Sequence, residues 1–93
     1  MLQLNYRCRT GEVDIVAQEG DYLCFVEVKY RTNQRAGTPE EAVGISKQRR
    51  ICRVADYYLL THPNMAQKQV RFDVVAILGE TITLYKNAFP YIG

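Results

Sequence analysis

The alternation of hydrophobic and polar residues along positions 11–31 is typical of two strands joined by a tight turn. The first segment alternates over 12–15 and the second runs over 23–29, and both are rich in β-branched residues. Gly20 and Asp21 between them fit a two-residue turn with glycine at its first central position. The pattern therefore predicts an antiparallel hairpin.

The two-residue loop fixes the register of this hairpin. It places Asp14 opposite Glu27 and Glu12 opposite Lys29, with the Cβ atoms of each pair about 5 Å apart on one face. A one-residue slip would place Asp14 opposite Val26 and would mix the polar and apolar faces. We therefore expect one face to carry the four charged residues, with Val16 and Phe25 nearer the turn. The other face is expected to be apolar, with Val13, Ile15, Ala17, Cys24, Val26 and Val28.

Two opposed carboxylates form a set of ligands that suits a hard divalent cation. Mg²⁺ takes oxygen ligands and keeps several waters, so Asp14 and Glu27 would suffice to bind it. Such an ion stabilises charge on a phosphate and activates a water, which Lys29 would help to hold. The alternative is a solvated polar face with cross-strand ion pairs, which is common in antiparallel sheets. The residues alone leave both interpretations open.

The remaining pattern predicts one principal helix and three further strands. An edge strand is expected at 6–9, a short helix at 39–43 after Thr38 and Pro39, and the main helix at 46–61, with Ser46 as its cap. The apolar run at 70–78 indicates a strand inside the sheet, and Gly79-Glu80 makes a turn into a last strand at 81–85. Phe89 and Tyr91 are expected to pack on the body, and His62 to cap the main helix or lie at the surface.

Two polar residues at the start of the main helix point toward its apolar side. At 100° per residue, Lys47 and Gln48 fall within the apolar arc one turn before Ile51, whereas Arg49, Arg50 and Arg53 lie on the opposite side. An inward lysine requires an anionic partner, such as the carboxylate patch or a bound phosphate. The alternative is that the lysine extends its ammonium to the rim.

Composition is that of a single globular domain over 1–93. Of its 93 residues 47% are hydrophobic and 24% charged, and no apolar run approaches the length of a membrane span. Cys8, Cys24 and Cys52 lack metal-ligand spacing, and the last two fall at apolar positions. We interpret Cys24 and Cys52 as small core residues, and we expect the protein to lie in a reducing, cytoplasmic compartment.

Positive charge is concentrated in the middle of the chain. The chain has a net charge of +2, but residues 29–53 carry +5 and the remainder −3. Such a segment suits a protein that binds a phosphate backbone, although a solvated helix face would give the same charge pattern.

Together these segments resemble a known family. The stretches G-E-V-D-I-V-A, F-V-E-V-K, K-Q-R-R-I and R-F-D-V-V are similar to those of the YraN-like family of small bacterial proteins. That family resembles the PD-(D/E)xK nucleases, near the archaeal Holliday-junction resolvases, and the resemblance spans residues 5–89. It implies an α/β fold that is restriction-endonuclease-like, with a mixed five-stranded sheet and one principal helix.

The resemblance also implies roles for the candidate residues. Asp14 matches the first metal-binding aspartate, Glu27 and Lys29 match the E-x-K pair, and Glu12 belongs to the family's G-E-x-D signature. Lys47 and Gln48 match a helix position that supports the site from the side. The implied cofactor is Mg²⁺ or Mn²⁺, and the residues expected to contact nucleic acid, with DNA favoured, are Lys47, Gln48, Arg31, Arg35, Arg49, Arg50 and Arg53.

The resemblance also implies a helix before the hairpin, at a place where this sequence opens on Met1-Leu2-Gln3, so either the sequence is a truncated form or this variant lacks the helix. We expect this N-terminal helix of the family to be absent and the sheet surface it would cover to be covered by a second copy in a homodimer.

The leading hypothesis is a metal-dependent endonuclease that hydrolyses phosphodiester bonds in DNA or structured nucleic acid, with Asp14, Glu27, Lys29 and Glu12 as catalytic residues. The second is a nucleic-acid-binding module with the same fold and without turnover. The third is an interaction domain whose charges form only a solvated face. No membrane association is expected.

Overall fold

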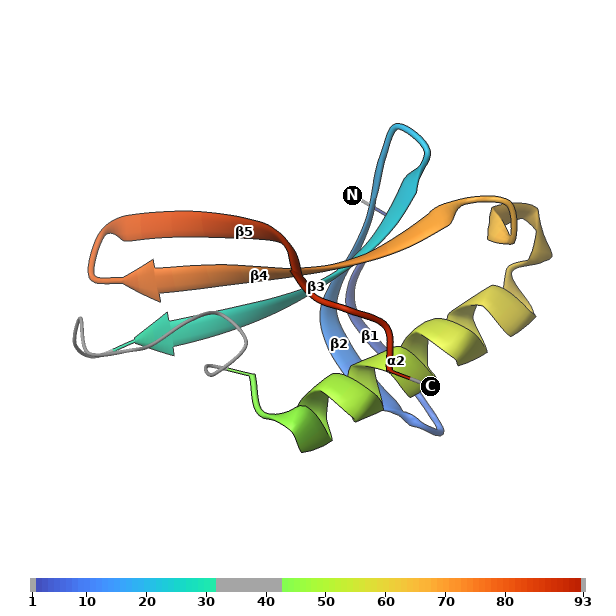
Figure 1. The fold of residues 1–93 in the computed structure, drawn as a ribbon, viewed down its shortest axis with the longest axis horizontal. Helices are drawn as coiled ribbons and strands as arrows, with labels where there is room; N and C mark the ends of the chain where they lie inside the picture. The colour runs from blue at the N-terminus through green and yellow to red at the C-terminus, as the bar shows by residue number, and fades with distance from the viewer. Residues whose placement is uncertain (1, 32–42, 93) are drawn as a thin grey trace.

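The computed structural model describes residues 2–31 and 43–92, in which the strands form one five-stranded sheet in chain order (Figure 1). All neighbouring strands are antiparallel except β3 and β4, which run parallel because helix α2 connects them. This mixed sheet with one main helix confirms the α/β fold and is consistent with a restriction-endonuclease-like arrangement. The elements are β1 Gln3–Cys8, β2 Gly11–Glu19, β3 Tyr22–Arg31, α2 Ile45–Thr61, η1 Pro63–Met65, β4 Gln69–Leu78 and β5 Thr81–Phe89.

The predicted boundaries are close to those observed, with a few differences. The edge strand is β1, which begins earlier than predicted, and β5 extends to Phe89 rather than residue 85. The predicted short helix falls on residues 39–42, outside the described residues, and on Val43. Neither helix in the described ranges has the length and apolarity needed to cross a bilayer.

Both predicted turns are present. Gly20 and Gly79 have φ angles of 57° and 58°, a left-handed conformation that glycine adopts without steric penalty. The β2–β3 ladder pairs Glu19 with Tyr22 and continues to Ile15 and Val26, which confirms the predicted register over this part of the hairpin.

Beyond Ile15 strand β2 departs from the predicted alternation. Asn5 in β1 has a φ of 51°, and the β1–β2 ladder passes from the Leu4–Ile15 pair to the Tyr6–Val13 pair. Val13 is consequently buried in the core below the helix, so its predicted place on the opposite face with Ile15 is wrong. The irregular backbone shifts the side-chain alternation at this point.

The same irregularity gives Glu12 a different partner from the predicted one. The β2–β3 ladder ends at the Ile15–Val26 pair, and Glu12 lies opposite Arg7 of β1. The Arg7 Nε atom is 3.0 Å from a Glu12 carboxylate oxygen. The predicted Glu12–Lys29 pair is therefore wrong, because β2 turns away from β3 toward β1.

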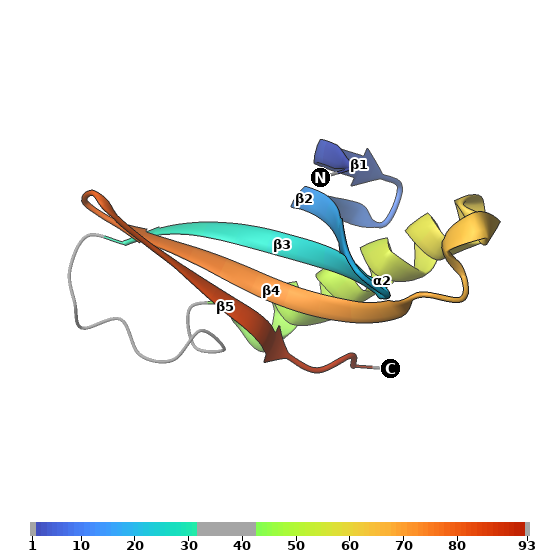
Figure 2. The same cartoon turned by 90° about the horizontal axis from the view of Figure 1, so that it is seen from above.

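Helix α2 covers one face of the sheet and forms the core with it (Figure 2). The predicted apolar arc is confirmed, since Ile51, Val54, Ala55 and Tyr58 are buried. Burial of side chains the size of Ile51 and Val54 contributes about 1.5–3 kcal/mol each to folding. The sheet side of this core includes Tyr6, Val13, Val16, Leu23, Phe25, Phe72 and Val74.

The helix ends combine predicted and unpredicted features. Gly44 is the N-cap residue and makes no side-chain cap, so the predicted Ser46 cap is wrong. At the other end His62 is the C-cap residue and stacks on Tyr58, with ring centroids 3.9 Å apart. The predicted position of His62 at a helix end is confirmed.

The C-terminal segment packs against the body as expected. Phe89 stacks on Phe72, and the Tyr91 hydroxyl contacts Asp56 and Arg53 of α2. Cys24 and Cys52 are buried and free, which agrees with their expected place in the interior.

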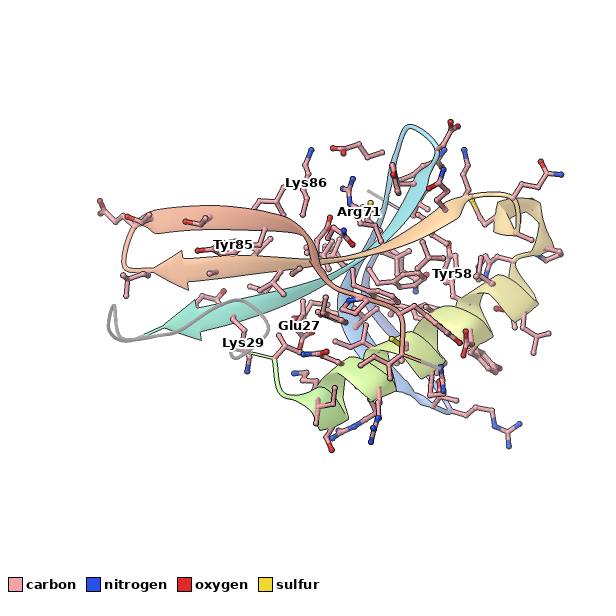
Figure 3. All side chains as sticks on the ribbon, in the orientation of Figure 1. Glu27, Lys29, Tyr58, Arg71, Tyr85 and Lys86 are labelled. Atoms are coloured by element: carbon pink, nitrogen blue, oxygen red, sulfur yellow. The ribbon has the colours of Figure 1, made fainter. Side chains whose placement is uncertain are left out.

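The face of the sheet opposite α2 carries a charge network that the sequence did not suggest (Figure 3). Arg71 donates hydrogen bonds from Nε and Nη2 to the carboxylate of Asp73, and from Nη1 to Glu19. Lys86 also binds Glu19, with an Nζ–Oε1 distance of 3.0 Å. The backbone N–H of Asn87 completes the set by donating to Asp73.

Candidate active site

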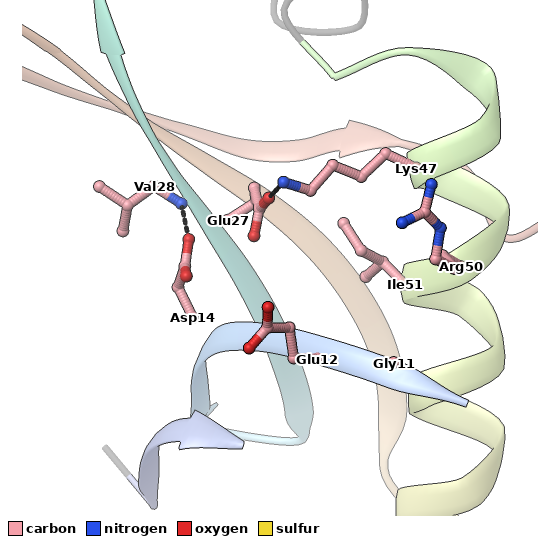
Figure 4. A pocket seen from close by; sticks show the side chains of 8 residues that line it. All are labelled: Gly11, Glu12, Asp14, Glu27, Val28, Lys47, Arg50 and Ile51. Carbon is pink, nitrogen blue, oxygen red and sulfur yellow. Dashed lines mark hydrogen bonds and ion pairs between the residues drawn. The ribbon is translucent and has the colours of Figure 1, made fainter. Parts of the chain in front are cut away.

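A pocket of about 350 Å³ opens between β2, β3 and the first turns of α2 (Figure 4). Acidic side chains from the strands face basic side chains from the helix across this space. The lining residues are Gly11, Glu12, Asp14, Glu27, Val28, Lys47, Arg50 and Ile51.

Glu27 lies at the base of the pocket. The side chains of Leu23, Phe25 and Glu27 alternate onto the α2 face of β3, so the strand carries a carboxylate toward a hydrophobic core. Glu27 is only 3% exposed. Burial raises the pKa of the Glu27 carboxyl, the ammonium of Lys47 opposes this shift, and the nearby Asp14 adds to it. A buried carboxylate of this kind requires positive charge close by.

That charge comes from Lys47, in the first turn of α2. Its ammonium forms an ion pair with Glu27, and the side chain stays about half exposed. Gln48 is 6% exposed, and its Nε2 donates to the carbonyl oxygen of Val43 at 2.8 Å. The sequence prediction that both residues point inward is confirmed, and the anionic partner of Lys47 is the carboxylate patch.

Asp14 occupies the position where the β2–β3 ladder ends. Its Oδ2 accepts a hydrogen bond from the backbone N–H of Val28 at 2.8 Å. The carboxylate thus replaces the backbone acceptor that a continued ladder would have supplied. It lies beside Glu27, close enough to raise the pKa of that residue, so the predicted juxtaposition of Asp14 and Glu27 is confirmed.

Glu12 and Arg50 complete the rim of the pocket. Both are exposed, and the Glu12 carboxylate is shared with Arg7 at the outer edge. Figure 4 shows the carboxylates of Glu12, Asp14 and Glu27 around one space, with Arg50 across it on α2. The pocket thus gathers three acidic and two basic side chains.

The other candidates lie elsewhere. Lys29 lies further along β3 than Glu27 and is not among the residues that line the pocket (Figure 3). Arg49 is exposed on α2, outside the lining. Arg53 donates to the Tyr91 hydroxyl and the Ile92 carbonyl, so its guanidinium binds the C-terminal segment. The side chain of Arg31 and all of Arg35 lie outside the described residues.

Sequence reasoning about the site did not include Gly11. Its φ is 141°, and a Cβ atom at this position would lie 3.4 Å from the Val54 side chain of α2. Glycine therefore lets β2 pass close to the helix and forms one wall of the pocket. The feature of the sequence that could have identified Gly11 is its place immediately before Glu12 in the G-E-V-D stretch.

The donor set fits a hard divalent cation that retains most of its waters. Across residues 2–31 and 43–92 no three His, Cys, Asp or Glu side chains gather closely enough to hold a metal by themselves. Asp14 and Glu27 supply two carboxylates, and Mg²⁺ commonly binds through one or two together with waters and substrate phosphate. The residues present thus suit Mg²⁺ or Mn²⁺ better than zinc, which takes nitrogen and sulfur ligands.

Comparison with known proteins identifies the family. Residues 1–77 match the model of uncharacterised protein family UPF0102. The chain belongs to this family. A UPF0102 protein of Lachnoclostridium phytofermentans is 58% identical over 93 residues, which cover 100% of this chain and 79% of the relative. UPF0102 proteins of Syntrophus aciditrophicus and Anaeromyxobacter sp. are 46% and 43% identical, over 96% of this chain and 72% and 69% of theirs.

Membership of UPF0102 confirms the YraN-like resemblance drawn from the sequence. The matched region, residues 1–77, includes β1, β2, β3 and α2, and therefore every residue that lines the pocket.

Proposed function

We propose that this UPF0102 protein is a metal-dependent endonuclease that hydrolyses phosphodiester bonds in DNA or structured nucleic acid. The observation that carries the proposal is the buried Glu27 carboxylate beside Asp14, in a solvent-accessible pocket. A carboxylate with a raised pKa next to a second carboxylate is an unfavourable arrangement for stability alone. A divalent cation would relieve it.

Asp14 and Glu27 are the residues that would hold Mg²⁺ or Mn²⁺. When bound, such an ion supplies charge neutralisation at the scissile phosphate and lowers the pKa of a water. The hydrogen bond from the Val28 N–H fixes Asp14 with one oxygen directed away from the backbone contact. The β3 strand, packed on α2, holds Glu27 rigidly, as a site of this kind requires.

The ion pair with Glu27 suggests that Lys47 has an electrostatic role in the reaction. Its ammonium neutralises Glu27 in the free protein and remains beside the reacting phosphate when substrate enters, where it would stabilise negative charge that develops on phosphoryl oxygens. Lys29 is proposed to hold the attacking water or a neighbouring phosphate. Glu12 would act on the pocket side as an additional water-binding carboxylate.

The helix face provides the electrostatic contribution to nucleic-acid binding. Arg50 lines the pocket and Arg49 is exposed next to it on α2, so both can reach phosphates on either side of the scissile bond. Contacts of this type are salt-dependent and independent of base sequence.

A specific observation favours a second candidate, a nucleic-acid-binding module without turnover. The described residues contain no third close ligand, and Lys47 already neutralises Glu27 in the free protein. In this case the pocket would bind phosphate through Lys47 and Arg50 without any metal. Its DNA affinity would be unchanged in the Asp14→Asn/Glu27→Gln double variant.

The test is a calorimetric titration with Mg²⁺ and Mn²⁺ of the wild type and of Asp14→Asn. We expect binding in the wild type and a loss of at least about tenfold in affinity in Asp14→Asn. The matched control is Asp21→Asn, which removes an exposed carboxylate from the β2–β3 turn and should leave binding unchanged.

Cleavage of linear and branched DNA with and without the metal then separates the two candidates. Metal-dependent cleavage that disappears in Asp14→Asn supports the endonuclease. Salt-sensitive DNA binding without metal binding or cleavage supports the module instead. If there is neither metal binding nor DNA binding at low salt, both are wrong and the charges form only a solvated face.

A further inference from the structure

Strand β5 is the last strand of the sheet, and in the described part of the chain only β4 pairs with it. Seven consecutive residues from Thr81 to Asn87 are exposed. Figures 1 and 2 both show the β4–β5 hairpin extending past the N-terminal end of α2, away from the helix-covered core. Its outer edge therefore presents unpaired backbone groups to the surroundings.

The first half of this edge lacks the features by which soluble proteins protect edge strands. The stretch T-I-T-L-Y at 81–85 has no charge and no proline, and its residues favour strands. Ile82 is 69% and Leu84 50% exposed. The irregularity comes only later, where Asn87 has a φ of 54° and the ladder shifts near Phe72 and Val74. Residues 81–85 thus form a regular strand segment available for pairing, with Glu80 in the turn before it and Lys86 directly after it.

Alternation along the β4–β5 ladder identifies the residues that face outward. The two-residue turn closes on the Leu78–Thr81 pair, so Thr81, Thr83 and Tyr85 direct their backbone groups to β4. Ile82 and Leu84 direct theirs to the free edge. Two such edges can pair only in registers that bring outward-facing residues opposite one another.

We propose that two copies of this chain pair antiparallel through β5, with the two-fold axis at Thr83. In this register Ile82 lies opposite Leu84 of the partner subunit and Leu84 opposite the partner's Ile82, so outward backbone groups meet. Just beyond the two ends of the paired segment, Glu80 of the turn then faces Lys86 of the partner subunit, and Lys86 faces the partner's Glu80. The edge is thus self-complementary in backbone, apolar side chains and charge, as an isologous contact requires.

The alternative registers lose this complementarity. An axis at Ile82 or at Leu84 would also pair outward-facing groups, but neither brings Glu80 opposite Lys86. Lys86 is bound to Glu19 within its own chain and stays about half exposed. An ammonium group has three donors, so Lys86 can contact Glu19 and the partner's Glu80 together. Charge therefore favours the Thr83 axis.

The location of this contact leaves the pocket accessible. β5 and the pocket lie at different parts of the sheet, since the pocket is formed by β2, β3 and α2. Pairing through β5 does not require the proposed hydrolysis. It also differs from a dimer that covers the sheet face near β1 and β2, because the contact is an edge and not a face.

Single cysteines test the register directly. A residue on the two-fold axis faces itself across a non-hydrogen-bonded pair with Cα atoms about 4.5 Å apart, which is within disulfide reach. We expect Thr83→Cys to form a disulfide-linked dimer under mild oxidation, and Ile82→Cys and Leu84→Cys to form much less. The wild-type protein is the control for crosslinking through the native cysteines Cys8, Cys24 and Cys52. Preferential crosslinking at 82 or 84 overturns the Thr83 axis, and crosslinking at none of the three overturns the edge contact.

Charge reversal provides a test that needs no covalent bond. Glu80→Lys and Lys86→Glu each place like charges opposite one another, so each alone should raise the dimer dissociation constant at least about tenfold in sedimentation velocity. Mixing the two variants should restore dimers, because each mixed pair has opposite charges. Circular dichroism verifies that both remain folded.

Leu60→Lys is the matched control, because Leu60 is 77% exposed on α2, away from β5. It should leave the dimer unchanged. A wild type that is monomeric up to about 100 μM overturns the proposal, as does a mixture of the two charge variants that stays monomeric.

Discussion

The two faces of the sheet hold buried acidic residues in different ways. Asp73, on the face opposite α2, is 2% exposed and accepts hydrogen bonds from Arg71 through two nitrogens and from the Asn87 backbone. The hydrogen bonds that Arg71 donates to Asp73 raise the pKa of Arg71 above its ordinary value. Glu27, on the α2 face, is 3% exposed, has a half-exposed lysine as its partner and borders a pocket.

This difference separates a structural charge network from a candidate reactive one. Around Asp73 and Glu19 the two acidic side chains are matched by Arg71 and Lys86, and the bidentate geometry leaves little to gain from a ligand. In the pocket the carboxyl pKa of Glu27 is raised chiefly by burial, and a second carboxylate lies beside it. We therefore expect an added cation to stabilise the second arrangement and not the first.

The largest expected effect comes from breaking the structural network. Arg71→Ala should destabilise the protein by about 3–5 kcal/mol, because it leaves Asp73 buried without its partner. Urea denaturation at pH 7 measures this loss. The affinity for Mg²⁺ should be unchanged wherever the variant is folded. A loss of stability below about 1 kcal/mol, or a change in metal affinity, would contradict the division into two networks.

A smaller effect is expected when the lysine of the pocket is removed. Lys47→Met should destabilise the protein by about 1–3 kcal/mol at pH 7, since Glu27 loses its charged hydrogen-bond partner. The loss should shrink as the pH falls toward 4.5, because Glu27 then becomes neutral and needs no cation. Urea denaturation at several pH values gives both numbers.

The matched control for Lys47 is Arg50→Met, which removes a positive charge from the same helix at an exposed position. Its effect on stability should be smaller and independent of pH between 4 and 7. Equal effects of the two substitutions would show that Lys47 affects stability only through the total positive charge of the helix. The Glu27–Lys47 pair would then have no specific role.

The smallest expected effect concerns the pH dependence contributed by Glu27 itself. A carboxyl whose folded-state pKa is raised binds its proton more tightly in the folded than in the unfolded protein. Its contribution to stability is therefore fully present below the ordinary value of 4.5 and is lost as pH rises through the raised pKa. Glu27→Gln should abolish this decline and leave the protein at pH 7 as stable as the wild type, or more so by about 1 kcal/mol.

Differential scanning calorimetry of Glu27→Gln and wild type across pH 4–8 measures this dependence. The comparable change on the other face, Asp73→Asn, removes a bidentate partner of Arg71 and should destabilise at neutral pH. If Glu27→Gln also destabilises strongly at pH 7, then Glu27 contributes to stability in the same way as Asp73.

Much of the pocket was accessible to sequence reasoning because it depends on local rules. The two-residue turn at Gly20 and Asp21 fixed which residues of β2 and β3 meet, so Asp14 and Glu27 were expected side by side. Helical periodicity placed Lys47 inward, and its partner proved to be the carboxylate patch. Both rules depend on only a few neighbouring residues, so tertiary packing does not change their outcome here.

Errors arose where contacts between distant segments override the local pattern. The conformation of Asn5 in β1 accompanies the break in alternation that buries Val13 and moves Glu12 toward Arg7. The hydrogen bonds from Arg53 to the Tyr91 hydroxyl and the Ile92 carbonyl were likewise not predicted. Neither partner could be identified from periodicity within one element.

The sequence by itself determined the strands, the turns, the helix and the faces on which most of their side chains lie, because these follow from periodicity and backbone preference. Tertiary structure alone decided how far each acidic residue is neutralised. That depends on which cation the folded chain brings near and on how much water remains. Arg71 closes tightly around Asp73, whereas Lys47 reaches Glu27 across an open pocket.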